Sequence, residues 1–182
     1  MEEVSKIRIY IVGSVASGKS TLARRISQIT YIPCYHLDEI VYVEDASDSW
    51  GNRKRPVEER DCLFQTILKK ENYIIEDAGR ECFLHGMAQA DIIILLETPL
   101  IIRKKRILFR WIKQNLGIEQ CIYKPHCDML KAMFRWAKDY DTGKDGTKGR
   151  VSKFKDKVVV LHNNKEIRKF LKTQLAGSSY HI

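Results

Sequence analysis

Residues 13 to 20 read Gly13-Ser14-Val15-Ala16-Ser17-Gly18-Lys19-Ser20, which satisfies the pattern G-x-x-x-x-G-K-[ST] at every fixed position. Glycine lets the backbone wrap a phosphate without Cβ clashes, and successive N–H groups then point inward as an anion nest. Lys19 supplies a mobile positive charge for the outer phosphates, and the Ser20 hydroxyl suits Mg²⁺. The motif therefore predicts a nucleotide-phosphate site. Its expected contact residues are Gly13, Ser14, Ala16, Ser17, Gly18, Lys19, Ser20 and Thr21.

The surroundings of this motif predict the fold class. An apolar strand (residues 6–12) precedes it, and residues 21–29 have helical spacing. Further short apolar runs follow Pro33, at 73–75, at 92–96 and at 158–161, and helical patterns separate them. Continuous apolar strands that alternate with helices are typical of a parallel sheet covered on both faces. We expect an α/β, three-layer, doubly wound P-loop NTPase fold with a five-stranded parallel sheet in the order 2-3-1-4-5.

Charge is concentrated in one part of the chain. The 182 residues include 32 Lys and Arg against 23 Asp and Glu, a net +9. Residues 101–155 hold fifteen of these basic groups and five acidic ones, or +10, which leaves −1 for the rest. One domain fits this length. We expect it to span residues 1–182, with a core at 1–100 and 156–175, a helical basic lid at about 101–155 and a tail at 176–182. Polar loops are expected at 46–55 and 141–149.

Several protein classes do not fit the sequence. The acidic start Met1-Glu2-Glu3 lacks the apolar run of a signal peptide, and no apolar run approaches the ~20 residues of a membrane helix. The five cysteines include no C-x-x-C pair, as in proteins with reduced thiols. We therefore expect a cytoplasmic protein without a membrane partner. The N-K-x-D motif by which GTPases recognise guanine is not found. The nearest stretch, residues 163–166, reads Asn-Asn-Lys-Glu and lacks the aspartate at its place.

A short chain with an early phosphate loop and a basic segment before its last strand resembles the nucleoside monophosphate kinase and shikimate kinase group. Within that group it looks like the bacterial DNA topology modulation (FlaR-related) family of adenylate-kinase-like proteins. The matching features are the loop to Thr21, residues 33–38 (P-x-Y-H-L-D), Trp50, residues 73–76, residues 96–99, Arg106 with Arg110, residues 134–136, and residues 158–161 to 170–171. The sequence departs from the family pattern at Glu76-Asp77-Ala78, usually Asp-Gly-Asn, and at Glu97, usually Asp.

The resemblance implies an ATP- and Mg²⁺-dependent phosphotransferase acting on a small molecule, with nucleotides among the candidates. Asp38 would hold water on Mg²⁺, or orient the acceptor and act as a base. Glu76 or Asp77 would supply a further acid for Mg²⁺, and Glu76 is the one we select. The implied catalytic residues are Lys19, Asp38, Arg106 and Arg110, the last two as lid arginines over the transferring phosphate.

The remaining candidates concern the two substrates. Arg80 lies in a stretch that resembles D-G-x-P-R of adenylate kinases, where the arginine grips the acceptor phosphate. Arg53 is a further candidate for acceptor binding, and Asn163 for binding adenine after the last strand. Arg103, Arg106 and Arg110 share a helix face by their spacing.

Two other functions stay open. The basic segment allows a nucleotide-regulated DNA-binding or topology factor, and the loop alone allows a nucleotide-binding protein without productive catalysis. Oligomeric state and acceptor identity cannot be read from the sequence.

Overall fold

The computed structural model describes residues 6–121 and 123–175. Five parallel strands form the central sheet: β1 (Arg8–Gly13), β2 (Cys34–His36), β5 (Tyr73–Asp77), β6 (Ile92–Leu96) and β7 (Val158–Leu161). Their order is β2-β5-β1-β6-β7, which is 2-3-1-4-5 when these five are counted in sequence order. The predicted fold class and strand order are confirmed. No helix within the described residues is long and apolar enough to cross a membrane.

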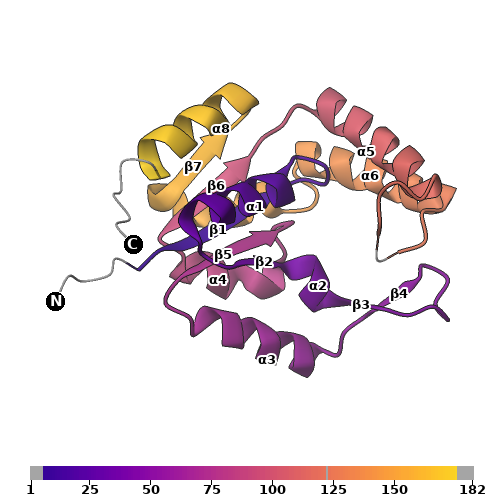
Figure 1. Cartoon of the computed structure of the whole chain (residues 1–182), viewed down its shortest axis with the longest axis horizontal. Coiled ribbons are helices and arrows are strands. Elements are labelled where there is room, and N and C mark those ends of the chain that lie inside the picture. The colour runs from indigo at the N-terminus through magenta and orange to yellow at the C-terminus, as the bar shows by residue number, and fades with distance from the viewer. Residues whose placement is uncertain (1–5, 122, 176–182) are drawn as a thin grey trace.

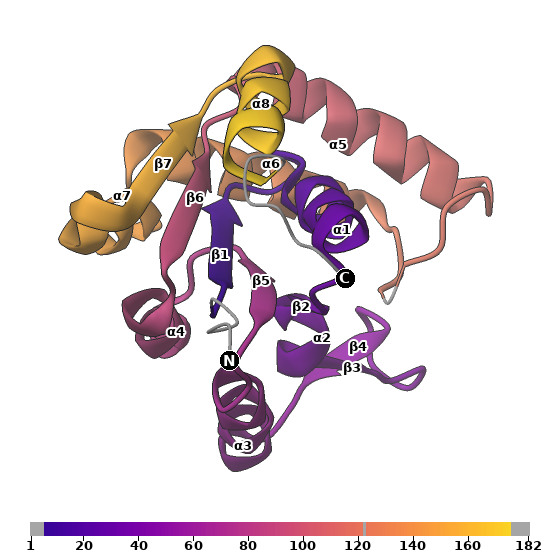
Figure 2. The same ribbon diagram turned by 60° about the vertical axis from the view of Figure 1, so that its left-hand side comes forward.

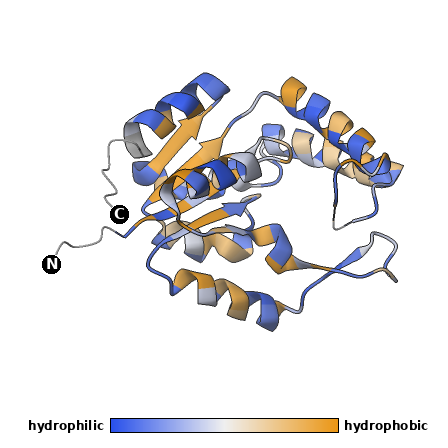
Figure 3. Ribbon diagram, viewed as in Figure 1, coloured by the Kyte–Doolittle hydropathy of each residue, from blue (hydrophilic) through white to orange (hydrophobic). Residues whose placement is uncertain are grey.

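Both faces of the sheet are covered, as the continuous apolar strands predict (Figures 1 and 2). In β1, Ile9 and Ile11 pack on one face under α1 (Lys19–Thr30) and α8 (Asn164–Phe170). Tyr10 and Val12 pack on the other face with residues of α2 (Leu37–Val41), α3 (Val57–Leu68) and α4 (Leu84–Gln89). Figure 3 shows the central strands as the most apolar part of the molecule. Alternate residues of one strand thus enter two separate cores.

The segment expected as a lid has two structural parts. Helices α5 (Leu100–Asn115) and α6 (Cys127–Thr142) pack together around Ile107 and Met133, and Val15 and Ala16 of the phosphate loop touch this small core. In contrast, Val151 at the end of α7 (Thr147–Val151) packs into the core that contains Tyr10 and Val12. Of the segment expected as a lid, α5 and α6 therefore form a core of their own, whereas α7 belongs to a core of the central sheet.

Two loops expected from the sequence are partly regular structure. Strands β3 (Tyr42–Glu44) and β4 (Asn52–Lys54) form an antiparallel hairpin, where a loop was expected at 46–55. The expected loop at 141–149 is shortened by the end of α6 and by α7. Only Tyr42, at the start of β3, packs against a main core, and β4 belongs to none of the cores, so the hairpin needs no apolar alternation and gives little sequence signal. Short helical segments complete the chain: η1 (Glu81–Phe83), η2 (Ser152–Lys157) and the π-helical η3 (Leu171–Leu175).

Candidate active site

The phosphate loop joins the end of β1 to the start of α1 at the carboxyl edge of the sheet. A Cβ on Gly13 would lie 2.7 Å from the backbone oxygen of Leu96, so a side chain there would force the loop away from β6. Gly18 caps α1 in the left-handed region (φ 103°), and Ala16 also has a positive φ (57°). Glycine adopts such angles freely, whereas alanine in this region is strained. The motif therefore builds a tight turn whose N–H groups precede a helix N-terminus, the arrangement that binds phosphate.

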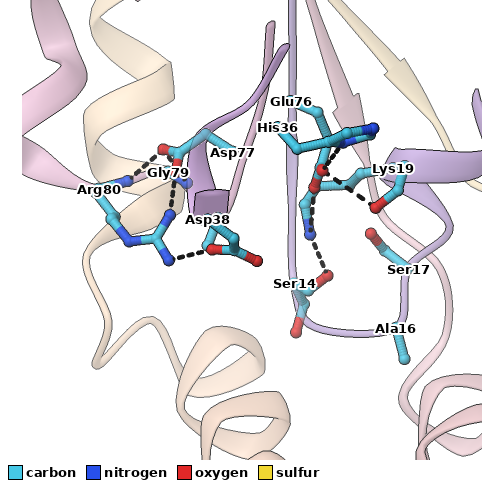
Figure 4. A network of polar contacts seen from close by, with 12 residues as sticks. Ser14, Ala16, Ser17, Lys19, His36, Asp38, Glu76, Asp77, Gly79 and Arg80 are labelled. Carbon is cyan, nitrogen blue, oxygen red and sulfur yellow. Dashed lines mark hydrogen bonds and ion pairs between the residues drawn. The ribbon is translucent and has the colours of Figure 1, made fainter. Parts of the chain in front are cut away.

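Lys19 and Ser20 both contact Glu76 of a neighbouring strand, and Figure 4 shows Lys19 and His36 beside this acid. Lys19 Nζ donates to the backbone oxygen of Ser14 at 2.9 Å and lies 3.5 Å from Glu76 Oε1. The Ser20 hydroxyl donates to Glu76 Oε2 at 3.1 Å, and His36 Nδ1 lies 2.8 Å from the same oxygen. Glu76 is the penultimate residue of β5, which lies beside β1, and His36 is its register partner on β2. Two of the predicted metal residues, Ser20 and Glu76, are thus brought together.

This buried network keeps Glu76 ionised. Burial by itself raises the pKa of Glu76, but the hydrogen bond from His36 and the charge of Lys19 outweigh it and hold the pKa at about 2. The contacts of His36 with the Cys34 sulfur, at 3.9 Å, and with Glu76 raise the pKa of the imidazole to about 10. Glu76 therefore stays a carboxylate at neutral pH, the form that binds Mg²⁺.

A second cluster holds the acceptor-side candidates Asp38 and Arg80. The Arg80 guanidinium pairs with the Asp38 carboxylate and, at 2.6 Å, with Asp77 Oδ1. Asp77 Oδ2 accepts from the backbone N–H groups of Gly79 and Arg80, each at 2.7 Å. Asp77 is 1% exposed and its oxygens are used in this turn. Asp38 pairs with Arg80 here, and within the described residues it makes no hydrogen bond with Ser20. The three predicted metal residues therefore divide between two clusters.

The three arginines that share a face of α5 by spacing have different environments. Arg103 is 1% exposed and donates to Ser14 Oγ (2.6 Å), and to the backbone oxygens of Thr98 (2.8 Å) and Ala137 (3.0 Å). Arg106 Nη1 donates to the backbone oxygens of Ala16 (3.2 Å) and Ser17 (2.8 Å).

Arg110 has its guanidinium 3.2 Å from Glu119, at a half-exposed position. Of the two predicted lid arginines, Arg106 is therefore at the phosphate loop, and Arg110 is paired elsewhere.

Two observations indicate that the loop can bind a polyphosphate. The Ser17 hydroxyl is buried and has no hydrogen-bond partner in the described structure, although buried hydroxyls are normally satisfied. The backbone oxygen of Ser17 is held by the Thr98 hydroxyl at 2.8 Å as well as by Arg106. Outer contacts thus fix the loop carbonyls while a buried inner hydroxyl remains free for a ligand. The hydroxyl and carboxylate of Ser20 and Glu76 are hard oxygen donors, which suit Mg²⁺.

The other predicted residues lie further from this network. Asn163 caps α8: its Oδ1 accepts from the N–H groups of Lys165 and Glu166, each at 3.0 Å. Its side chain is therefore occupied, and the adenine contact expected of it would have to come from backbone groups nearby. Arg53 lies on the β3–β4 hairpin, 3.4 Å from Asp45. Thr21 is exposed in the first turn of α1.

Three positions at the candidate site were missed or misjudged from the sequence. The pairing of His36 with Glu76 was not expected from the sequence. The register of β2 against β5 is the signal that places the two residues side by side. Thr98 and Arg103 carry no local pattern for their contacts with the loop. Their burial becomes visible only when α5 and α6 are placed beside it.

Comparison with known proteins supports the fold. The sequence matches no protein-family model and no curated protein. The structure is similar to a gluconokinase from Sinorhizobium meliloti (13% identity, 96% of this chain and 93% of that one, TM-score 0.53). It is also similar to a shikimate kinase from Aquifex aeolicus (14% identity, 96% of this chain and 100% of that one, TM-score 0.53). A shikimate kinase from Acinetobacter baumannii in complex with shikimate is a further neighbour (16% identity, 96% of this chain and 97% of that one, TM-score 0.56). The chain therefore shares the fold of these kinases. At these identities the likeness concerns the fold, and the chemistry has to be argued from the site.

Proposed function

We propose that the protein is an ATP- and Mg²⁺-dependent phosphotransferase that moves a phosphoryl group to a small-molecule acceptor. The observation that carries this proposal is the complete loop from Gly13 to Ser20, with Lys19 and Ser20 joined to the ionised Glu76. The P-loop kinase fold adds support. A nucleotide stays among the candidate acceptors because Arg80 matches the position that grips an acceptor phosphate in adenylate kinases.

The residues of the loop bind and position the donor. Backbone N–H groups and the N-terminus of α1 hold the phosphates of ATP, and the free Ser17 hydroxyl adds a donor. Lys19 moves from the Ser14 oxygen to the outer phosphates, where its charge offsets the negative charge that develops in transfer. Ser20 and Glu76 would hold Mg²⁺, which would supply positive charge to offset the negative charge of the phosphates.

The arginines of α5 stabilise the transferring group. Arg106 already contacts the loop carbonyls, so its guanidinium needs only a small reorientation to face a bound phosphate. Arg110 would first have to leave Glu119. Arginines that face a transferring phosphoryl group accelerate such reactions by roughly 10³–10⁵. We therefore assign the larger catalytic effect to Arg106.

The acceptor side is built on Asp38 and Arg80. Arg80 presents a guanidinium that can hold a phosphate or a carboxylate, and Asp77 fixes it from behind. Asp38 lies on the exposed side of that pair and would orient an acceptor hydroxyl and take its proton. Two of the structural neighbours are named for gluconate and shikimate, which are hydroxy acids. Hydroxy acids therefore belong in the acceptor panel beside nucleotides and sugars, and Arg53 stands as an outer contact from the hairpin.

A phosphate-transfer screen tests the proposal. The protein is incubated with ATP, Mg²⁺ and panels of nucleotides, sugars and hydroxy acids, and products are followed by phosphorus NMR. We expect transfer to one acceptor class with little hydrolysis of ATP, and no transfer by Lys19→Ala. Lys131→Ala is the matched control, because Lys131 is exposed on α6 and Asp128 is its one ion-pair partner among the described residues. Normal turnover in Lys19→Ala, or ATP hydrolysis without transfer to any acceptor, would contradict the proposal.

The basic helical segment favours a second candidate, a nucleotide-regulated DNA-binding or topology factor. Residues 113–155 carry exposed lysines on α6 and after it, including Lys131, Lys138 and Lys144. Phosphate contacts by such groups make affinity fall steeply with salt. Duplex binding that is sensitive to salt and changes with ATP would support this candidate. Absence of duplex binding at low salt would remove it.

A further inference from the structure

The outer face of α5 is apolar although it faces away from the protein. Its large exposed side chains are Ile101 (63%), Ile102 (42%), Leu108 (42%), Phe109 (61%) and Ile112 (39%), followed by Leu116 (68%) just past the helix. Positions that recur every three to four residues lie on one side of a helix. Figures 1 and 2 both place α5 at the edge of the molecule, and Figure 3 shows its alternating apolar and polar bands. An apolar stripe of this size normally contacts something.

The inner face of the same helix already has its partners. Ile107 is 1% exposed and packs against α6, and Arg103 is buried among loop and α6 groups. The core between α5 and α6 is therefore formed without the exposed apolar residues of the outer face. Within the described residues, no element covers it.

The positive charge of α5 indicates which kind of partner could cover this apolar stripe. Helix α5 contains Arg103, Lys104, Lys105, Arg106, Arg110 and Lys113 and no acidic residue. Arg103 pairs with Asp141 and Arg110 with Glu119, whereas Lys104, Lys105 and Lys113 have no ion pair among the described residues. Lysines beside exposed aliphatic and aromatic side chains are the composition of helices that lie in the interface of an anionic lipid bilayer.

We propose that the outer face of α5, defined by Ile101, Ile102, Leu108, Phe109, Ile112 and Leu116 with Lys104, Lys105 and Lys113, docks this protein on an anionic lipid surface. A second copy fits less well, because two such faces would bring like charges together in an apolar contact. Nucleic acid would use the lysines but leaves the six apolar side chains without a role. The proposal concerns a helix that lies on the membrane surface. It differs from the expectation drawn from the sequence, which was that the protein has no membrane partner. It does not depend on the proposed function.

Co-sedimentation with lipid vesicles tests the contribution of the apolar side chains to docking. The full chain is mixed with vesicles of phosphatidylcholine alone or with about one third phosphatidylglycerol. We expect binding to the anionic vesicles only. Leu108→Gln/Phe109→Gln should weaken it at least tenfold, because each fully buried apolar side chain contributes more than a tenfold factor. The control, Val57→Gln/Leu63→Gln, changes two similarly exposed apolar residues of α3 and should bind like the wild type.

A second pair of variants tests the charge. Lys104→Gln/Lys105→Gln should weaken vesicle binding roughly thirty-fold, since each lysine near an anionic surface contributes about 1 kcal/mol. Lys69→Gln/Lys70→Gln removes the same charge from exposed positions after α3 and should have little effect. Circular dichroism and unfolding in urea establish that each variant is folded.

The alternatives give distinct results that overturn the proposal. One is absence of binding to both vesicles. Another is vesicle binding that the Leu108/Phe109 variant retains, which would show adsorption by charge alone. Self-association in light scattering that this variant abolishes would assign the face to a second copy. Duplex DNA binding lost in the Lys104/Lys105 variant, without vesicle binding, would assign it to nucleic acid.

Discussion

Replacing Arg103 by methionine should destabilise the protein more than any other arginine change on α5. The substitution keeps an unbranched side chain in place but removes every donor. It leaves the backbone oxygens of Thr98 and Ala137 and the Ser14 hydroxyl without their present partner. It also removes the ion pair with Asp141 and the contact over the Tyr140 ring, whose centre lies 5.3 Å away.

The magnitude follows from burial. Each buried acceptor left unsatisfied costs about 1–3 kcal/mol, and breaking a buried ion pair costs about 3–5 kcal/mol. The two terms overlap because they concern one guanidinium, and Asp141 is about one third exposed, so water can partly replace its partner. We expect a loss of about 3–5 kcal/mol in the free energy of unfolding for Arg103→Met. Arg110→Met, on the same helix but half-exposed beside Glu119, should cost less than about 1 kcal/mol.

Equilibrium unfolding in urea, followed by circular dichroism, measures both variants. Equal m-values would establish that the midpoint shift reports stability. If Arg103→Met is too unstable to purify, Arg103→Lys retains the charge and should be intermediate. Losses below about 1 kcal/mol for both Arg103→Met and Arg110→Met would refute the assignment of Arg103 as a buried structural arginine.

Three further outcomes follow from the site and its surroundings. Because the pKa of Glu76 is held at about 2, below its unfolded value, its contribution to stability is present above about pH 5 and is lost as the pH falls towards 2. Glu76→Gln should therefore weaken the fall of the free energy of unfolding with decreasing pH, measured by urea unfolding at several pH values. An unchanged pH dependence would count against the network. Gly79→Ala should cost more than about 2 kcal/mol, since a Cβ would lie 2.4 Å from Thr147 at φ +88°, whereas Gly117→Ala, in open space at φ +70°, should cost about 1 kcal/mol; equal losses would contradict the crowding. Asn163→Ala should cost about 1 kcal/mol as a lost helix cap and leave ATP affinity unchanged, and a tenfold weaker affinity would return that side chain to the adenine site.

The central sheet was predictable because its signal is local. The runs before Gly13 and from Ile92 to Leu96 are continuously apolar, and only a strand buried on both faces needs that pattern. The motif from Gly13 to Ser20 likewise specifies its own turn. The β3–β4 hairpin escaped prediction because β4 reads Asn-Arg-Lys and packs into no core.

The candidate site was predictable only in part, because its contacts join distant segments. The spacing of Arg103, Arg106 and Arg110 places them on one face of α5, but only the docking of α6 buries the first and leaves the last at the surface. The meeting of His36 and Glu76 depends on the register of two strands separated by 36 residues of chain between Leu37 and Asn72. No periodicity within either strand carries that information.

Titration of Mg–ATP into the protein by calorimetry tests the central claim most directly, namely that Gly13 to Ser20 hold the phosphates of a nucleotide. We predict saturable binding of ATP to the wild type, weakened roughly ten- to a hundredfold in Lys19→Ala, because a charged donor is lost. Lys131→Ala, an exposed lysine of α6, should bind like the wild type. Equal affinity in the wild type and Lys19→Ala, or no binding to the wild type, would contradict the account.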